Sequence, residues 1–174
     1  KPLLGELHGA TGLVVHLAVL DGSDVVYLDK IGDRVCGGLP TRVGGRQPAH
    51  CTAVGKAILA YCDAGAEIDF RARKTRYSLS SGSQLAAELA KVRAHGVAFE
   101  REESLLGFGC VAAPIGAIGE AVAAVSVCGA MNSMRFDQRL TAPVRKAAMG
   151  IWRNVDGNQV APTLQPPRAL LRYA

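Results

Sequence analysis

A tight hairpin near the N-terminus places the strongest constraint on the fold. Residues 13–20 are apolar apart from His16, and a second strand-like run follows at residues 24–31. The short connection between them contains Asp21-Gly22, a frequent hairpin turn. A helical crossover needs about a dozen residues, so the two strands must pair antiparallel. The chain therefore predicts a sheet that begins antiparallel.

The rest of the chain alternates between helical and strand-like patterns. We expect helices at residues 1–12, at 51–62, from a Ser83 cap to His95, and from about Ala142, because Pro143 should break an earlier start. Strands are predicted at residues 97–101, 109–115 and 120–128, with a glycine-rich loop or irregular strand at 37–45. This order predicts an α+β fold with one central antiparallel sheet flanked by helices.

Composition indicates one globular domain. The chain has 174 residues, of which 49% are hydrophobic and 20% charged, enough for a substantial core. No apolar run approaches the roughly 18 residues of a membrane span. The five cysteines form no CxxC pair. We therefore expect reduced thiols in a cytoplasmic protein, without a disulfide framework.

The net charge of +5 arises from two local runs of cations. Residues 34–56 hold four cations and no acid, and residues 71–76 hold four more. Neither run has a recognition helix or interleaved aromatic residues, so direct nucleic-acid binding is not indicated. We interpret the cations as a solvated surface, or as a patch that attracts anionic ligands to a pocket.

The sharpest local feature is the start of the second helix, in residues 46–56, where a loop containing Pro48 leads directly into the helix. The first N–H groups of a helix lack internal partners and lie at the positive end of its dipole. They can bind a carboxylate or phosphate, to which Thr52 could add a hydroxyl. The equally weighted alternative is that Thr52 or Cys51 merely caps the helix.

Small side chains on two late strands suggest the other wall of a site. Ser126 and Cys128 share one face of their strand, as Cys110 and Ala112 do on the neighbouring strand. They suit a compact polar ligand, although small residues also simply fill tight space. Alternation places Glu100 on the opposite face from its two neighbours, where it could hold a ligand hydroxyl or remain solvated.

Catalysis has little support. His50 adjoins Cys51, but sequence neighbours seldom orient a thiol toward an imidazole, and no separate His and Asp or Asn pair completes a triad. The motifs GxSxG, HExxH and the P-loop are absent from the sequence, and the cysteine and histidine spacing suggests no metal site. We expect neither an enzyme, nor a metal, nor a cofactor.

The order of these segments resembles the effector-binding domain of the IclR family of bacterial transcription regulators. Residues 15–30 are similar to its opening hairpin, and residues 43–57 to its most characteristic segment. Residues 96–103, 107–115 and 123–129 continue the pattern in the same order. Each motif alone is weak, but the ordered set is specific and covers about residues 5 to 155.

The resemblance implies a GAF/PAS-like sensor fold in residues 13–155, preceded by the end of a linker helix in residues 1–12. Residues 156–174 would form a loosely ordered tail. In this family an N-terminal winged helix-turn-helix domain, absent from this chain, binds operator DNA. Relatives bind small organic acids, often aromatic or keto acids, and assemble as homodimers or homotetramers.

The resemblance also implies which residues contact the effector. These positions lie at a helix start and on the late strands, and they fall on Ala53, Val54, Glu100, Phe108, Cys110, Ser126 and Cys128. Cys128 stands where relatives often have serine, and Glu100 where aspartate is common. Two other hypotheses remain: a thiol-dependent enzyme that uses Cys51 on a GAF-like scaffold, and a purely structural oligomerisation module.

Overall fold

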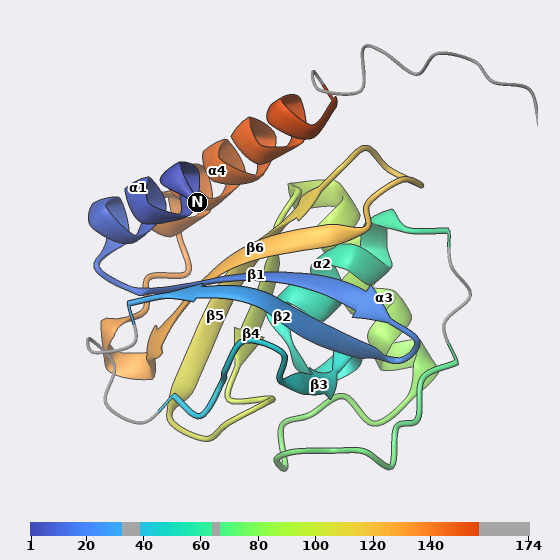
Figure 1. Cartoon of the computed structure of the whole chain (residues 1–174). Helices are drawn as coiled ribbons and strands as arrows, with labels where there is room; N and C mark the ends of the chain where they lie inside the picture. Colours follow the sequence, from blue (N-terminus) through green and yellow to red (C-terminus); the bar gives the residue numbers. More distant parts are fainter. Residues whose placement is uncertain (33–38, 64–66, 157–174) are drawn as a thin grey trace, which may run out of the picture.

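A curled antiparallel sheet organises the computed structural model, which describes residues 1–32, 39–63 and 67–156 (Figure 1). Within these residues six strands pair in the order β3-β2-β1-β6-β5-β4, and every neighbouring pair is antiparallel. The strands are β1 (Val14–Asp21), β2 (Asp24–Ile31), β3 (Arg46–Pro48), β4 (Ala98–Arg101), β5 (Phe108–Ile115) and β6 (Ala123–Ala130). The predicted hairpin and fold class are confirmed.

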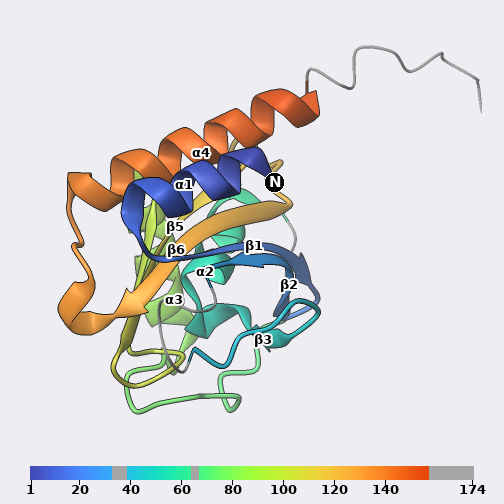
Figure 2. The same ribbon diagram turned by 60° about the vertical axis from the view of Figure 1, so that its left-hand side comes forward.

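Helices cover both faces of the sheet. Two of them, α1 and α4, lie side by side on one face, and α2 and α3 pack on the other (Figures 1 and 2). Their bounds are α1 (Pro2–Thr11), α2 (Ala53–Tyr61), α3 (Gly82–His95) and α4 (Gln138–Asp156), with short 3-10 turns η1 (Ala49–Cys51) and η2 (Met131–Ser133). No helix in these described ranges combines the length and apolarity needed to cross a bilayer.

Strand alternation divides the interior into two cores. Val15 and Leu17 on β1 face α1 and α4, whereas Ala18, beyond a bulge after Leu17, packs with α2. On β4, Phe99 belongs to the first core, and Glu100 is buried on the opposite face, as its alternation predicts. The face covered by α2 and α3 therefore carries the polar groups of the candidate site.

Three helix starts differ from those predicted. Ser81, not Ser83, caps α3 by accepting a hydrogen bond from the Gln84 N–H. Helix α2 begins at Ala53 rather than Cys51, because residues 49–51 form the separate turn η1.

Helix α4 begins at Gln138, before the predicted start near Ala142, and contains Pro143. Asp137 supports the first turn, since its carboxylate accepts from the Arg139 N–H at 2.9 Å and its carbonyl accepts from the Thr141 N–H at 3.0 Å. Pro143, which has no N–H, leaves one helical hydrogen bond unmade within α4.

The strand predictions were less accurate at their bounds. The predicted strand at 120–128 is shifted to Ala123–Ala130, and the short edge strand β3 was not predicted.

The predicted linker-like helix at residues 1–12 ends at Thr11, where Gly12 adopts a left-handed conformation with φ 66°. The expected loose tail lies outside the described residues.

Candidate functional site

The start of α2 forms one wall of the candidate site. Thr52 caps the helix, and its Oγ1 accepts a hydrogen bond from the Gly55 N–H at 3.0 Å. The first helical bond runs from the Lys56 N–H to the Thr52 carbonyl at 3.0 Å. The N–H groups of Ala53 and Val54 precede that bond, so neither can find a partner within the helix. The capping alternative is confirmed for Thr52, yet it leaves these two amide groups for a ligand.

Close packing behind this helix start requires a glycine. A Cβ atom at Gly55 would overlap the backbone of Ala49 in the η1 turn. The loop before α2 therefore folds directly onto the first turn of the helix. This contact fixes the orientation of the first turn of α2.

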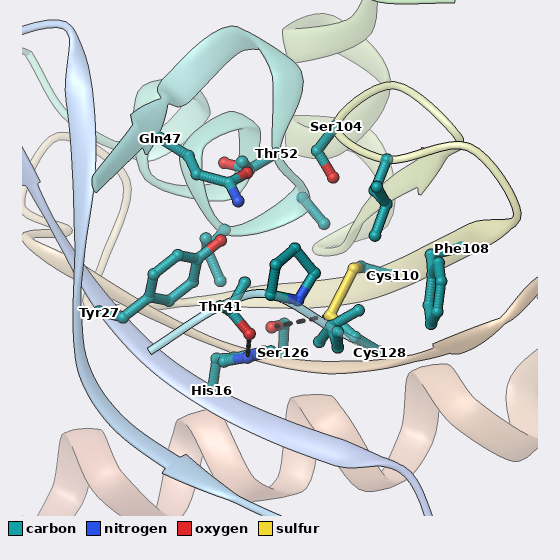
Figure 3. Close-up of a pocket in the computed structure, with 15 residues that line it drawn as sticks. His16, Tyr27, Thr41, Gln47, Thr52, Ser104, Phe108, Cys110, Ser126 and Cys128 are labelled. Atoms are coloured by element: carbon teal, nitrogen blue, oxygen red, sulfur yellow. Dashed lines mark hydrogen bonds between the residues drawn. A yellow bond between two sulfur atoms is a disulfide. The ribbon is translucent and has the colours of Figure 1, made fainter. Parts of the chain in front are cut away.

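A small cavity lies between the start of α2 and the sheet (Figure 3). Its volume is about 40 Å³, which is room for a few waters. Residues from both walls and from two loops line it: His16, Tyr27, Leu39, Pro40, Thr41, Gln47, Thr52, Ala53, Val54, Ser104, Leu105, Phe108, Cys110, Ser126 and Cys128.

Six of the seven residues proposed from the sequence meet around this cavity. Ala53 and Val54 come from α2, Phe108 and Cys110 from β5, and Ser126 and Cys128 from β6. The face-sharing argument for the late strands is therefore correct in geometry. Glu100 is the exception, because it does not line the cavity.

Glu100 is fully buried rather than solvated, with 0% of its surface exposed. Its Oε1 accepts hydrogen bonds from the backbone N–H groups of Glu103 at 2.5 Å and Ser104 at 2.9 Å. Its Oε2 has no hydrogen-bond partner among residues 1–32, 39–63 and 67–156. Burial raises the pKa of Glu100 to about 7, and the two backbone donors oppose that rise. Glu100 thus supports the loop that carries Ser104 to the cavity.

Cys110 and Cys128 form a disulfide across β5 and β6. They occupy directly opposite register positions, with their Cα atoms 4.2 Å apart. The expectation of reduced thiols is therefore wrong for this pair, because sequence spacing does not reveal which strands are neighbours. Cys51 and Cys62 are free thiols, and Cys36 lies outside the described residues.

Several polar lining residues were not predicted as site residues. Tyr27 on β2 directs its ring into the cavity, and burial followed by the charge of Glu100 raises the pKa of its hydroxyl, which stays protonated (Figure 3). His16 lies opposite Ser126 in the sheet register, and its ring centroid is 4.9 Å from that of Tyr27. Gln47 comes from the unpredicted strand β3. A signal existed only for His16, the single polar residue in an apolar strand.

Residues 39–41 lie across the cavity and are tied to the sheet. The Thr41 hydroxyl is 2.8 Å from Nε2 of His16. The Lys30 ammonium group donates to the carbonyls of Thr41 at 2.6 Å and Leu39 at 3.2 Å. Pro40, between these anchors, also contacts the cavity. Hydrogen bonds to β1 and β2 therefore hold this segment at the cavity.

The neighbouring His50 and Cys51 do approach each other. The Cys51 sulfur lies 3.3 Å from Nε2 of His50, so the expectation that the two would not be oriented together is wrong. Both residues are buried, and burial raises the pKa of the Cys51 thiol and lowers the pKa of the His50 imidazole. Both groups are therefore neutral near pH 7, and the thiolate that nucleophilic catalysis requires is disfavoured.

The cationic runs are only partly a solvated surface. Exposed Arg46 pairs with Asp21 at 2.5 Å and Asp24 at 3.3 Å, and exposed Arg71 pairs with Asp69. Lys56, by contrast, is buried and pairs with a glutamate of the loop between β4 and β5. Arg34 lies outside the described residues.

Comparison with known proteins gives the family. Residues 1–153 match the model of the bacterial transcriptional regulator IclR C-terminal domain. The chain belongs to the IclR family. The HTH-type transcriptional regulator XynR of Escherichia coli K12 is 36% identical over 121 residues, covering 66% of this chain and 48% of XynR. The transcriptional repressor IclR of Escherichia coli K12 is 34% identical over 158 residues, covering 84% and 57%. The chain thus spans about half the length of these relatives.

Solved structures agree on the fold. The C-terminal domain of Escherichia coli KdgR has a TM-score of 0.71 and 29% identity, covering 86% of this chain and 92% of that one. An IclR homologue from Microbacterium hydrocarbonoxydans, complexed with 4-hydroxybenzoate, has a TM-score of 0.77 and 22% identity, covering 90% and 66%. The IclR-family chain therefore has the GAF/PAS-like fold of IclR effector-binding domains.

Proposed function

We propose that this IclR-family domain binds a small organic acid through the cavity between α2 and the sheet. The observation that carries the proposal is that Ala53 and Val54, the first two residues of α2, line that cavity. A carboxylate there would accept two N–H hydrogen bonds at the positive end of the α2 dipole. The body of the acid would lie over Ser126 and the two cysteines opposite.

The size of the cavity favours a short acid. A volume of about 40 Å³ suits a two- or three-carbon keto acid better than an aromatic acid. An aromatic acid such as 4-hydroxybenzoate, present in the Microbacterium homologue, would require residues 39–41 to move aside. Tyr27 and Ser126, which both line the cavity and carry hydroxyl groups, would hydrogen-bond the keto oxygen.

In the whole protein, we propose that acid binding controls transcription. XynR and IclR, which are longer than this chain, are named as a helix-turn-helix regulator and a transcriptional repressor. The α1 helix would be the end of a linker from a winged helix-turn-helix domain, and it packs on α4, which in turn covers β5 and β6. An acid bound on the opposite face of those strands would shift α1 through the sheet, in a homodimer or homotetramer.

Catalysis at Cys51 fits this chain less well. The thiol is buried and its pKa is raised, and it faces a neutral imidazole. Cys51 is also not among the residues that line the cavity. The proposal therefore keeps the domain as a sensor without enzymatic activity.

Calorimetric titration of the reduced chain with pyruvate, glyoxylate and 4-hydroxybenzoate tests the function. We expect saturable binding of a keto acid, with the Ser126→Ala variant weakened about tenfold by the loss of one hydrogen bond. Ser133→Ala is the matched control, because Ser133 is exposed and lies outside the cavity. No binding of any of the three acids, or equal weakening in the control, would refute the proposed site.

A further inference from the structure

The disulfide lies inside the candidate effector cavity. Cys110 and Cys128 both line it, beside Ser126 on the same sheet face (Figure 3). Cys128 is 4% exposed and Cys110 is partly exposed. Neither of the free thiols, Cys51 and Cys62, lines this cavity.

We propose that Cys110 and Cys128 are a reversible thiol-oxidation site, and that a small peroxide is the oxidant. The pair is not needed to hold β5 and β6 together, because the two strands already pair along their whole lengths, from Phe108 opposite Ala130 to Ile115 opposite Ala123. What the pair changes is the chemistry of the cavity wall. The oxidation site itself does not depend on the proposed function; only the effect of oxidation on acid binding rests on it.

The size of the cavity selects the oxidant. Hydrogen peroxide is only slightly larger than water, and a cavity of about 40 Å³ admits it. A peptide disulfide such as oxidised glutathione is far too large to reach the sulfurs through the same space. The structure therefore favours peroxide over thiol–disulfide exchange as the route to oxidation.

The reaction begins at Cys110, the more exposed of the two cysteines. Its sulfur attacks one peroxide oxygen, the O–O bond breaks, the thiol proton passes to the leaving hydroxide, and the products are a sulfenic acid and one water. The Cys128 sulfur then attacks the Cys110 sulfur, an S–S bond forms and the S–O bond breaks, and the Cys128 thiol proton passes to the leaving hydroxide to give the second water. Two electrons pass from the two thiols to the peroxide, and both thiol hydrogens end in water.

Oxidation alters the hydrogen bonds available to a ligand. The reduced pair presents two S–H donors to the cavity, and the disulfide presents none. In the disulfide form the Ser126 hydroxyl lies 3.7 Å from the Cys128 sulfur and must be the donor, since that sulfur carries no hydrogen. An oxygen-rich acid therefore loses donors on oxidation. We expect the oxidised domain to bind pyruvate about tenfold more weakly than the reduced domain.

Peptide mass analysis tests the site without any effector. After treatment of the reduced chain with hydrogen peroxide, alkylation in denaturant and trypsin digestion, Cys110 and Cys128 fall in one peptide, residues 102–135. We expect this peptide to lose two hydrogens and to resist alkylation, and to become alkylated at both cysteines after dithiothreitol. Cys62→Ser and Cys36→Ser should behave as the wild type, and Cys128→Ser should leave a sulfenic acid on Cys110 that dimedone traps.

Alkylation of both cysteines despite peroxide, or loss of the intrapeptide bond in the Cys36→Ser variant, would overturn the oxidation site. Pyruvate calorimetry on the oxidised and reduced chains tests the consequence: dithiothreitol should restore the affinity of the reduced chain, and Cys62→Ser, which lies outside the cavity, should show the same change as the wild type. Equal affinity of both wild-type forms would overturn the link to acid binding. If pyruvate fails to bind the reduced chain, the proposed effector is refuted, whereas the peptide result still decides the oxidation site.

Discussion

Nζ of Lys56 lies 2.7 Å from Oε1 and 2.8 Å from Oε2 of Glu103. The Lys56 side chain is 1% exposed and that of Glu103 is 13% exposed, so the ion pair is largely removed from water. It ties the first turns of α2 to the loop between β4 and β5. One wall of the cavity is therefore joined to a loop that lines it by Lys56, a cation whose position in a cationic run had suggested a surface residue.

Removing that cation should destabilise the domain strongly. Lys56→Met leaves the Glu103 carboxylate in a buried site whose desolvation already raises its pKa. We expect a loss of about 3 kcal/mol in the free energy of unfolding, measured by urea denaturation at pH 7. The double variant Lys56→Met/Glu103→Leu should recover most of that loss. An exposed ion pair contributes at most about 1 kcal/mol. If Lys56→Met lowers the free energy of unfolding by less than that, the stabilising role of the buried pair is contradicted.

The Thr52 cap of α2 should contribute less to the free energy of unfolding than the ion pair does. Thr52→Ala removes the hydroxyl oxygen that accepts from the Gly55 N–H. We expect a loss of about 1 kcal/mol in unfolding free energy, whereas Thr52→Ser should remain close to the wild type. Thermal unfolding followed by circular dichroism measures both. Equal destabilisation by serine and alanine would mean that the methyl group, not the hydroxyl, matters.

Gly55 and Gly5 should respond to alanine in opposite directions. Both lie in helices, where alanine normally adds about 1 kcal/mol of stability. A Cβ at Gly5 meets open space, so Gly5→Ala should be stabilising. At Gly55 it would meet the Ala49 backbone, and overpacking should cost about 2 kcal/mol. Urea denaturation of the two variants checks this, and stabilisation by Gly55→Ala would contradict the packing.

Glu100 should make stability depend on pH in a definite direction. Its pKa is raised from 4.5 to about 7 in the folded state, so folding favours the protonated carboxyl. Its stabilising contribution is complete below pH 4.5 and is lost as the pH rises through 7, a change of about 3 kcal/mol. Glu100→Gln mimics the neutral form and should lack this change. Urea denaturation between pH 4.5 and 8 measures the difference in unfolding free energy between the wild type and Glu100→Gln. A difference that stays constant across this range would contradict the raised pKa of Glu100.

Local patterns account for much of the fold. The spacing between residues 13–20 and 24–31 is too short for anything but an antiparallel hairpin, and Gly12 and Gly96 end their helices as expected. Side chains alternate between the two faces along β5 and β6, and this alternation places Cys110, Ser126 and Cys128 on one face. These features depend on neighbours within a few residues, which is why sequence spacing suffices.

Long-range pairing accounts for the features that were missed or misjudged. Cys110 meets Cys128 because β5 and β6 align in one register, and Glu100 is buried because the loop after it folds back to donate two N–H groups. Tyr27 and Gln47 reach the cavity only because the sheet curls toward α2.

By itself, then, the sequence determined the hairpin, the helix periodicity and the family, all of which depend on short spacings and ordered motifs. Tertiary structure decided the neutral state of the His50–Cys51 pair, the burial of Lys56 and the disulfide. Solvent exclusion and cross-strand proximity set these properties. Both arise only when segments distant in sequence pack together.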